Sequence, residues 1–94
     1  MPYIHITRTP GVTLKDYQVV RAAMGTEPVE GQLVHIVGEV DGSLHTVDVW
    51  ESSAMADRFA AERLFPAFDK SGVHPGQDAT AEGFDGEIIT EVRA

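Results

Sequence analysis

Apolar and polar residues alternate along the segment from Gln32 to Ser53, in two runs that flank Asp41-Gly42. Asp and Gly both tolerate a positive φ, so this pair predicts a two-residue turn of the primed type. We therefore expect an antiparallel hairpin with strands at about 32–40 and 43–50.

The hairpin has two chemically different faces. Counting outward from the turn sets the register, in which the residues of one face pair as Val37 with Thr46, His35 with Asp48 and Leu33 with Trp50. The opposite face is aliphatic and consists of Val34, Ile36, Val47 and Val49. Because both faces carry apolar residues, both need to be covered.

The remaining elements are predicted from periodicity and end signals. Residues 3–7 alternate as a strand, and a helix over 13–24 follows, with Thr13 as its cap and Gly25 as its stop. A second helix begins after Ser52, and Pro66 predicts a kink or a break in it near 64–65. We expect a loop over 71–83 and a last strand over 84–92.

The order βαββαβ predicts one domain, residues 1–94, with a ferredoxin-like α+β fold. In this fold a four-stranded antiparallel sheet carries both helices on a single side. The aliphatic residues of the hairpin, joined by Ile4 and Ile6, would then face water in a monomer. The simplest cover is the same face of a second copy, so we expect a homodimer that closes a barrel.

Composition excludes several function classes. Lys and Arg number 7 against 15 Asp and Glu, and the resulting net charge of −8 disfavours nucleic acid and anionic membranes as partners. The chain has no cysteine, which removes disulfides, thiolate metal sites and thiol nucleophiles. No apolar run is long enough to span a bilayer, and the first residues do not read as a signal peptide, so we expect a cytoplasmic protein.

The main chemical candidate is His35 opposite Asp48, because a carboxylate beside an imidazole fixes its tautomer and raises its basicity. The pair predicts a general base, or else a cross-strand polar pair that only holds the register. Around it we expect a ligand cavity lined by Trp50, Tyr3, His5, Tyr17 and Thr46. A strand at 3–7 rotated by one residue would undo this arrangement.

The other histidines predict no site. His45 and His74 are expected to be solvated, and no two histidines have the spacing that places metal ligands on one face of an element. We therefore expect neither a metal nor a cofactor.

Three groups of residues resemble a known superfamily: Gly31-x3-His35-x2-Gly38-x2-Asp41-Gly42, then Val47-Asp48-Val49-Trp50-Glu51-Ser52, then Phe59 with Glu62-Arg63-Leu64-x-Pro66. The pattern is similar to small proteins of the dimeric α+β barrel superfamily, which includes the antibiotic-biosynthesis monooxygenases, and the likeness runs from Gly11 through Pro66. It implies a homodimer with an apolar pocket between sheet and helices in each protomer.

Activities in that superfamily include cofactor-independent oxygenation of aromatic polyketides, haem degradation, cyclisation and isomerisation. Trp50 matches a tryptophan of the haem-degrading members, but residues 53–71 lack the histidine that binds haem there. The resemblance thus implies a monooxygenase-like enzyme acting on a small apolar or aromatic molecule. The alternative is a dimeric binding or regulatory module without catalysis, in which the His35–Asp48 pair only holds the hairpin.

Overall fold

The computed structural model describes residues 1–89. The elements follow the predicted order, with the second helix divided into three consecutive segments. They are β1 (Tyr3–Pro10), α1 (Leu14–Met24), β2 (Gln32–Val40), β3 (Ser43–Trp50), α2 (Ser53–Phe59), the π-helical segment η1 (Ala60–Leu64), α3 (Phe65–Ser71) and β4 (Thr80–Asp85). The strands form one antiparallel sheet in the order β2-β3-β1-β4. The ferredoxin-like α+β fold is therefore confirmed.

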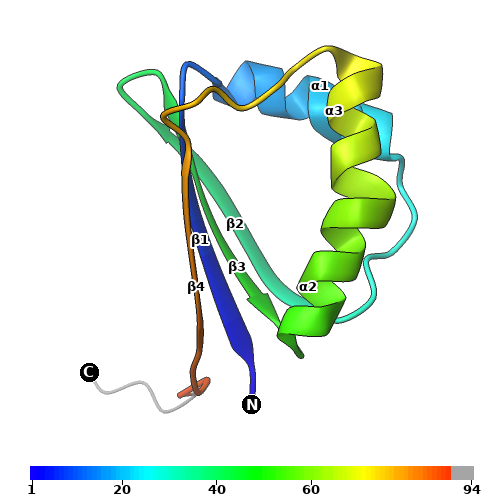
Figure 1. Cartoon of the computed structure of the whole chain (residues 1–94), viewed down its shortest axis with the longest axis vertical. Helices are drawn as coiled ribbons and strands as arrows, with labels where there is room; N and C mark the ends of the chain where they lie inside the picture. The colour runs from blue at the N-terminus through cyan, green and yellow to red at the C-terminus, as the bar shows by residue number, and fades with distance from the viewer. Residues whose placement is uncertain (90–94) are drawn as a thin grey trace.

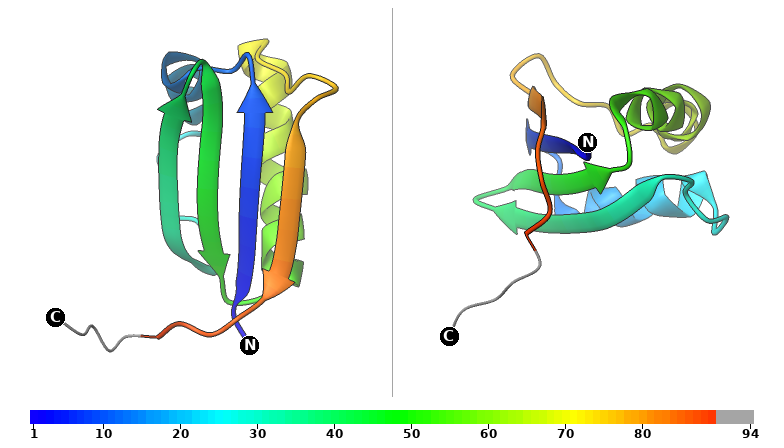
Figure 2. Two further views of the ribbon diagram at one scale, coloured as in Figure 1. Left: turned by 90° about the vertical axis from the view of Figure 1, so that its left-hand side faces the viewer. Right: turned by 90° about the horizontal axis from the view of Figure 1, so that it is seen from below.

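The helix α1 and the helical run α2–η1–α3 lie on the same side of the sheet (Figure 1). Seen from the opposite side, the four strands lie in front with no helix over them (Figure 2). The buried apolar residues belong to the covered side and, among residues 1–89, are few: Val20, Leu44, Trp50 and Ala67. Among residues 1–89, no helix has the length and apolar character that a bilayer crossing needs.

Capping residues begin both helices as expected. Thr13 and Asp16 form a reciprocal capping box at the start of α1, and Ser52 accepts a hydrogen bond from the Met55 amide at the start of α2. Each pair satisfies backbone donors that have no partner within the helix.

Pro66 interrupts the α-helical pattern without breaking the helix. The chain keeps helical dihedral angles through residues 59–65, and the Phe65 amide donates to the Ala60 carbonyl, five residues earlier. Proline cannot donate the usual bond to the preceding turn. The wider π turn directly before Pro66 is how the helix accommodates that loss.

The hairpin register is confirmed over most of its length, including the pair His35–Asp48. The prediction that Leu33 faces Trp50 is wrong, because a bulge between Gln32 and Val34 leaves Gln32 opposite Trp50. A bulge inserts one unpaired residue into a strand. Leu33 is that residue, and its side chain is exposed.

The last strand was predicted too late in the chain. β4 spans Thr80–Asp85 and pairs with β1 from Arg8 back to Tyr3, so residues 80–83 are strand and not loop. The Gly86 amide then donates to the Pro2 carbonyl, and residues 86–89 do not continue the ladder. The predicted strand residues 90–92 lie outside the described part of the chain. Of the expected loop over 71–83, only residues 72–79 connect α3 to β4.

Candidate functional site

The residues expected to line a site share the helix-facing side of the sheet. β1 pairs with β3 so that Tyr3 faces Trp50, His5 faces Asp48 and Thr7 faces Thr46. Directly paired residues of antiparallel strands point to the same side. The sequence left the rotation of β1 open, and this register resolves it in favour of the shared face.

The centre of this face is a chain of three hydrogen-bonded side chains. Asp48 Oδ1 contacts His35 Nδ1, and His35 Nε2 lies 2.5 Å from Tyr17 Oη. The side chains of His35 and Asp48 are 34% and 15% exposed, so the chain lies at the margin of the core, within reach of solvent. We call these three residues the Asp48–His35–Tyr17 relay.

The carboxylate sets the direction of the proton in this relay. An ionised carboxylate only accepts, so Nδ1 of His35 carries the hydrogen and Nε2 of the neutral ring is an acceptor. The Tyr17 hydroxyl then donates to Nε2. Both nitrogens of His35 are therefore engaged, whereas the Tyr17 oxygen keeps lone pairs free to accept a further hydrogen bond.

Local sequence places Tyr17 above His35. The Leu14 amide, at the first residue of α1, donates to Glu39 Oε1 of β2 at 2.7 Å. This bond holds the start of the helix on the strand. Tyr17 follows about one helical turn after Leu14, and His35 precedes Glu39 by four residues on the same face of the strand.

The hydroxyl of Tyr17 keeps its proton at neutral pH. Burial raises the pKa of Tyr17 above its ordinary value of 10.0, and the negative charge of Asp48 adds to this, while the nearby Arg21 lowers it. Tyr17 in the free protein is thus a neutral hydrogen-bond donor and a weak acid.

Trp50 lies on the same face of β3 as Asp48, two residues further along the strand. Its side chain is 2% exposed, and its ring packs on Phe59 of α2 with centroids 5.2 Å apart and an interplanar angle of 44°. The Arg63 guanidinium lies 5.9 Å from the Phe59 ring centroid on the side of η1. The indole is thus a core residue as well as a neighbour of the site residues on the same face.

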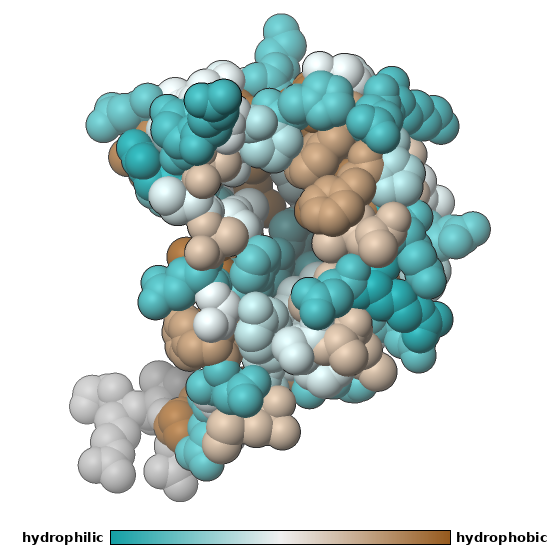
Figure 3. All heavy atoms as spheres, viewed as in Figure 1, coloured by the Kyte–Doolittle hydropathy of each residue, from teal (hydrophilic) through white to brown (hydrophobic). Residues whose placement is uncertain are grey.

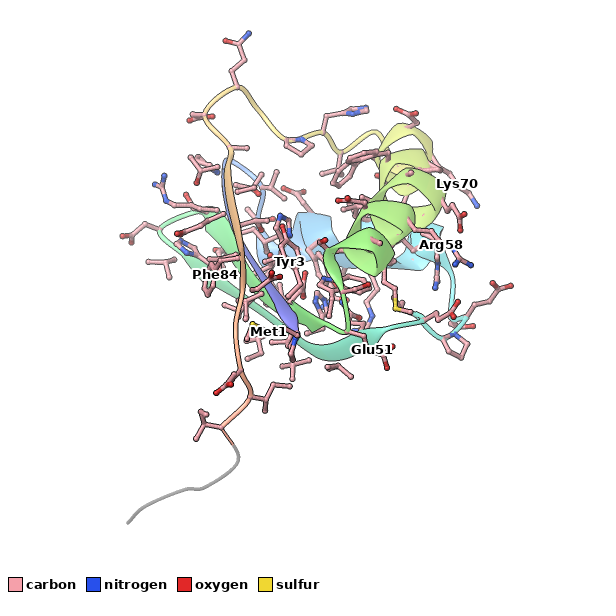
Figure 4. The ribbon with its side chains drawn as sticks, turned by 60° about the horizontal axis from the view of Figure 1, so that its bottom comes forward. Met1, Tyr3, Glu51, Arg58, Lys70 and Phe84 are labelled. Carbon is pink, nitrogen blue, oxygen red and sulfur yellow. The ribbon has the colours of Figure 1, made fainter. Side chains whose placement is uncertain are left out.

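Tyr3 and His5 continue the face toward β4. Their rings are stacked, with centroids 6.2 Å apart and an interplanar angle of 18°. A Cβ at Gly83, opposite His5, would lie 1.8 Å from Tyr3 Oη, so the tyrosine occupies the space that a side chain on β4 would need. Figure 4 shows Tyr3 on the helix side of the sheet and Phe84 on the other side. Nothing in the sequence pattern indicated this role of Gly83.

Space for a ligand lies between the sheet and the helical layer, where the molecule is hollowed (Figure 3). β4 contributes two small residues there, Gly83 opposite His5 and Ala81 opposite Thr7, and it places Asp85 opposite Tyr3 at its end. Thr7 and Thr46 share a hydrogen bond between their hydroxyl groups. Trp50 lies on the same face of the sheet as these threonines and is buried.

Two depressions lie on other parts of the surface. The larger, about 460 Å³, lies between the end of α1 and the segments η1 and α3, and the smaller, about 250 Å³, lies between residues 27–30 and α2. Neither includes a residue of the relay. His74 is exposed as expected, whereas His45 is half-buried on the uncovered face and not fully solvated.

Comparison with solved structures identifies the fold. Rv0793 from Mycobacterium tuberculosis superposes with a TM-score of 0.67 at 13% identity, over 97% of this chain and 100% of that one. A putative antibiotic biosynthesis monooxygenase from Deinococcus radiodurans gives 0.64 at 17% identity, over 100% of both chains. This chain has the fold of the antibiotic biosynthesis monooxygenases.

A third similar structure has a stated activity. SnoaB, a cofactor-independent oxygenase from Streptomyces nogalater, superposes with a TM-score of 0.65 at 15% identity, over 95% of this chain and 96% of its own. No protein-family model matches the sequence, and no curated protein matches it significantly. At these identities the likeness establishes the fold alone, and the chemistry has to be argued from the residues.

Proposed function

We propose that this protein is a monooxygenase-like enzyme that binds a small, largely apolar aromatic molecule and removes a proton from it without a tightly bound cofactor. The observation that carries the proposal is the Asp48–His35–Tyr17 relay on the helix-facing side of the sheet. The stated activity of SnoaB, whose fold this chain shares, supports oxygenation as the reaction that follows. Cyclisation or isomerisation of the same anion are the other outcomes that this chemistry serves.

In this reaction His35 is the base. An imidazole whose Nδ1–H is held by a carboxylate accepts a proton at Nε2 and becomes an imidazolium stabilised by Asp48. Loss of a proton from a phenol or enol leaves an electron-rich anion, which is the form that reacts with dioxygen. Trp50, Tyr3, His5 and Thr46 supply the aromatic and polar surroundings that orient the ligand.

The test compares two histidines of β2 and β3. Oxygen uptake and product formation are measured for a panel of hydroxylated anthrones, naphthols and hydroquinones with the parent protein, H35A and H45A. His45 lies on the uncovered face of the sheet, opposite Gly38, and serves as the matched control. We expect H35A to lose at least about 100-fold in turnover, the usual contribution of a general base, while H45A keeps it. Equal turnover in H35A and the parent protein would refute the assignment.

A second candidate function is a binding module without catalysis. It is favoured by the engagement of both nitrogens of His35 within the protein. In that case H35A lowers the free energy of unfolding, and ligands bind without being altered. Mass spectrometry of the ligand recovered after incubation distinguishes the two functions.

We further propose that the active form is a homodimer joined through the uncovered face of the sheet. Apolar side chains are exposed there on three strands: Ile6 37%, Val34 39%, Ile36 57% and Phe84 44%. A second copy packed on the same face about a twofold axis would remove this surface from water. The variant I36E is expected to be monomeric in sedimentation experiments. V19E, a control at a 49% exposed apolar position of α1, is expected to stay dimeric.

A further inference from the structure

Both ring nitrogens of His35 are occupied within the relay. Nδ1 of His35 faces Asp48, and Nε2 faces Tyr17 at 2.5 Å, so no nitrogen of the imidazole is left for a ligand. A base that accepts a proton directly must lie within hydrogen-bond reach of that proton. In this protein the Tyr17 hydroxyl stands between His35 and any molecule that approaches along the Nε2 direction.

We propose, resting on the function proposed above, that Tyr17 Oη and not the imidazole meets the acidic hydroxyl of the bound phenol or enol. Tyr17 is then the catalytic residue. His35 receives the proton behind it, and Asp48 positions His35.

The proton balance of this step is closed. The ligand O–H donates to a lone pair of Tyr17 Oη, and the Tyr17 hydroxyl donates to His35 Nε2. As the ligand O–H bond breaks, a new O–H bond forms on Tyr17, while the former Tyr17 proton moves to Nε2. The products are the ligand anion, a neutral tyrosine and an imidazolium paired with Asp48. No oxidant or reductant takes part in this step.

The placement of Tyr17 suits this role better than that of any other hydroxyl on the same face. The Thr7 and Thr46 hydroxyls bond to each other, and Tyr3 lies over Gly83, toward the opposite edge of the sheet. Tyr17 comes from the helix above the strand, so its oxygen is held between the two layers. The ligand class is accordingly one with an acidic hydroxyl on an aromatic or enolic ring, flat enough to enter between sheet and helices.

The test uses 4-nitrophenol, because its anion absorbs visible light and its neutral form does not. At a pH one unit below its pKa, roughly a tenth of the free phenol is ionised. A neighbouring imidazolium that lowers the pKa by about one unit raises this fraction to about a half, close to a fivefold gain. We expect this gain with the parent protein at saturating protein concentration.

Four variants separate the possible roles. Y17F and H35A are each expected to abolish the fivefold gain, and the double variant Y17F/H35A is expected to lose no more than either alone. H45A, on the uncovered face of the sheet and outside the proposed site, is the control and is expected to retain the gain. Binding is followed separately by quenching of Trp50 fluorescence, so that loss of ionisation is distinguished from loss of binding.

The outcomes discriminate between the inference and the function on which it rests. Retention of the gain in Y17F, with loss in H35A, overturns the inference and leaves the proposed function in place. No gain with the parent protein contradicts the proposed function itself, and the inference falls with it. Nitrogen NMR of His35 gives a check that needs no ligand: the inference requires the neutral ring to carry its hydrogen on Nδ1, and a hydrogen on Nε2 overturns it.

Discussion

Arg63 of η1 holds the end of α1 and the following loop. Replacing it by alanine should therefore lower the free energy of unfolding far more than replacing the neighbouring Arg58. Its guanidinium donates to the carbonyl oxygens of Glu27 at 3.0 Å, Pro28 at 3.2 Å and Met24 at 3.2 Å, and it lies near the Phe59 ring. These bonds join the helical run after β3 to the segment before β2. They therefore help to keep α1, and with it Tyr17, in place over the sheet.

The magnitude follows from the exposure of the bonds. Two of the carbonyl contacts are exposed and one is partly buried, so each bond is taken at about 0.5 kcal/mol, the low end of the range for the net contribution of a hydrogen bond in a protein. Together with the contact to the aromatic ring, the three hydrogen bonds contribute about 2 kcal/mol to the free energy of unfolding. In a domain of this size such a loss lowers the midpoint of thermal unfolding by about 8–16 °C.

Arg58, one helical turn earlier, is the matched control. It pairs with Glu30 and Glu62 at 3.5 Å, and all three side chains are more than half exposed. Exposed pairs of this kind contribute only about 0.3–0.5 kcal/mol. R58A loses two such pairs and should therefore lower the midpoint by less than about 8 °C, at most half the loss in R63A.

The assay is urea and thermal unfolding of R63A, R63K and R58A at one protein concentration, since association would make the midpoint depend on concentration. The fluorescence of the single tryptophan, Trp50, reports unfolding. R63K should lie between the parent and R63A, because an ammonium keeps the charge but cannot span three acceptors. Equal losses in R63A and R58A would refute the assignment of Arg63 as a clamp.

Two further predictions concern the tyrosines. In the Y3F variant only Tyr17 titrates as a phenol, and ultraviolet absorbance should give it a pKa above 10.0; a value at or below 10.0 would show that its hydroxyl is not buried as described. Because this folded-state pKa is raised, stability should be constant below the pKa of the unfolded chain and fall as the pH rises through and above 10, and Y17F should lack this part of the alkaline loss. The variant G83A should be about 1–2 kcal/mol less stable than G38A in urea unfolding, because a Cβ at 83 meets Tyr3 whereas one at 38 meets nothing within 4 Å; equal stabilities would contradict the placement of Tyr3.

Much of the fold follows from local signals in the sequence. The Asp41-Gly42 turn and the alternation beside it determine the hairpin and the pairing of His35 with Asp48, because side chains repeat every second residue. The capping residues give the starts of both helices for the same local reason. These features depend on neighbours in the chain, and they were predicted correctly.

The errors in the predicted strands arise where contacts between residues distant in sequence determine the structure. The strand propensity predicts a start at residue 84, yet the pairing with β1 begins at Thr80 and includes Gly83, which leaves the space that Tyr3 occupies. The bulge at Leu33 follows the left-handed Gly31, whose carbonyl accepts from the Glu51 amide and whose missing side chain leaves room for Met55. Neither constraint is visible in a local pattern.

The sequence predicts which residues share one face of the sheet, but it does not predict that Tyr17 contacts His35. Periodicity places Tyr17 on the apolar stripe of its helix and His35 on one face of its strand. The contact between them depends on how α1 is held by Glu39, which only the folded chain shows. The hydroxyl that stands in front of the imidazole is therefore the main addition of the structure to the chemistry.

The most direct test of this account is a crystal structure of the protein with 4-nitrophenol bound. We expect the phenol oxygen within hydrogen-bond distance of Tyr17 Oη, between the sheet and α1, with His35 behind it. A phenol seated only in the depression between the end of α1 and α3, or on the uncovered face of the sheet, would contradict it.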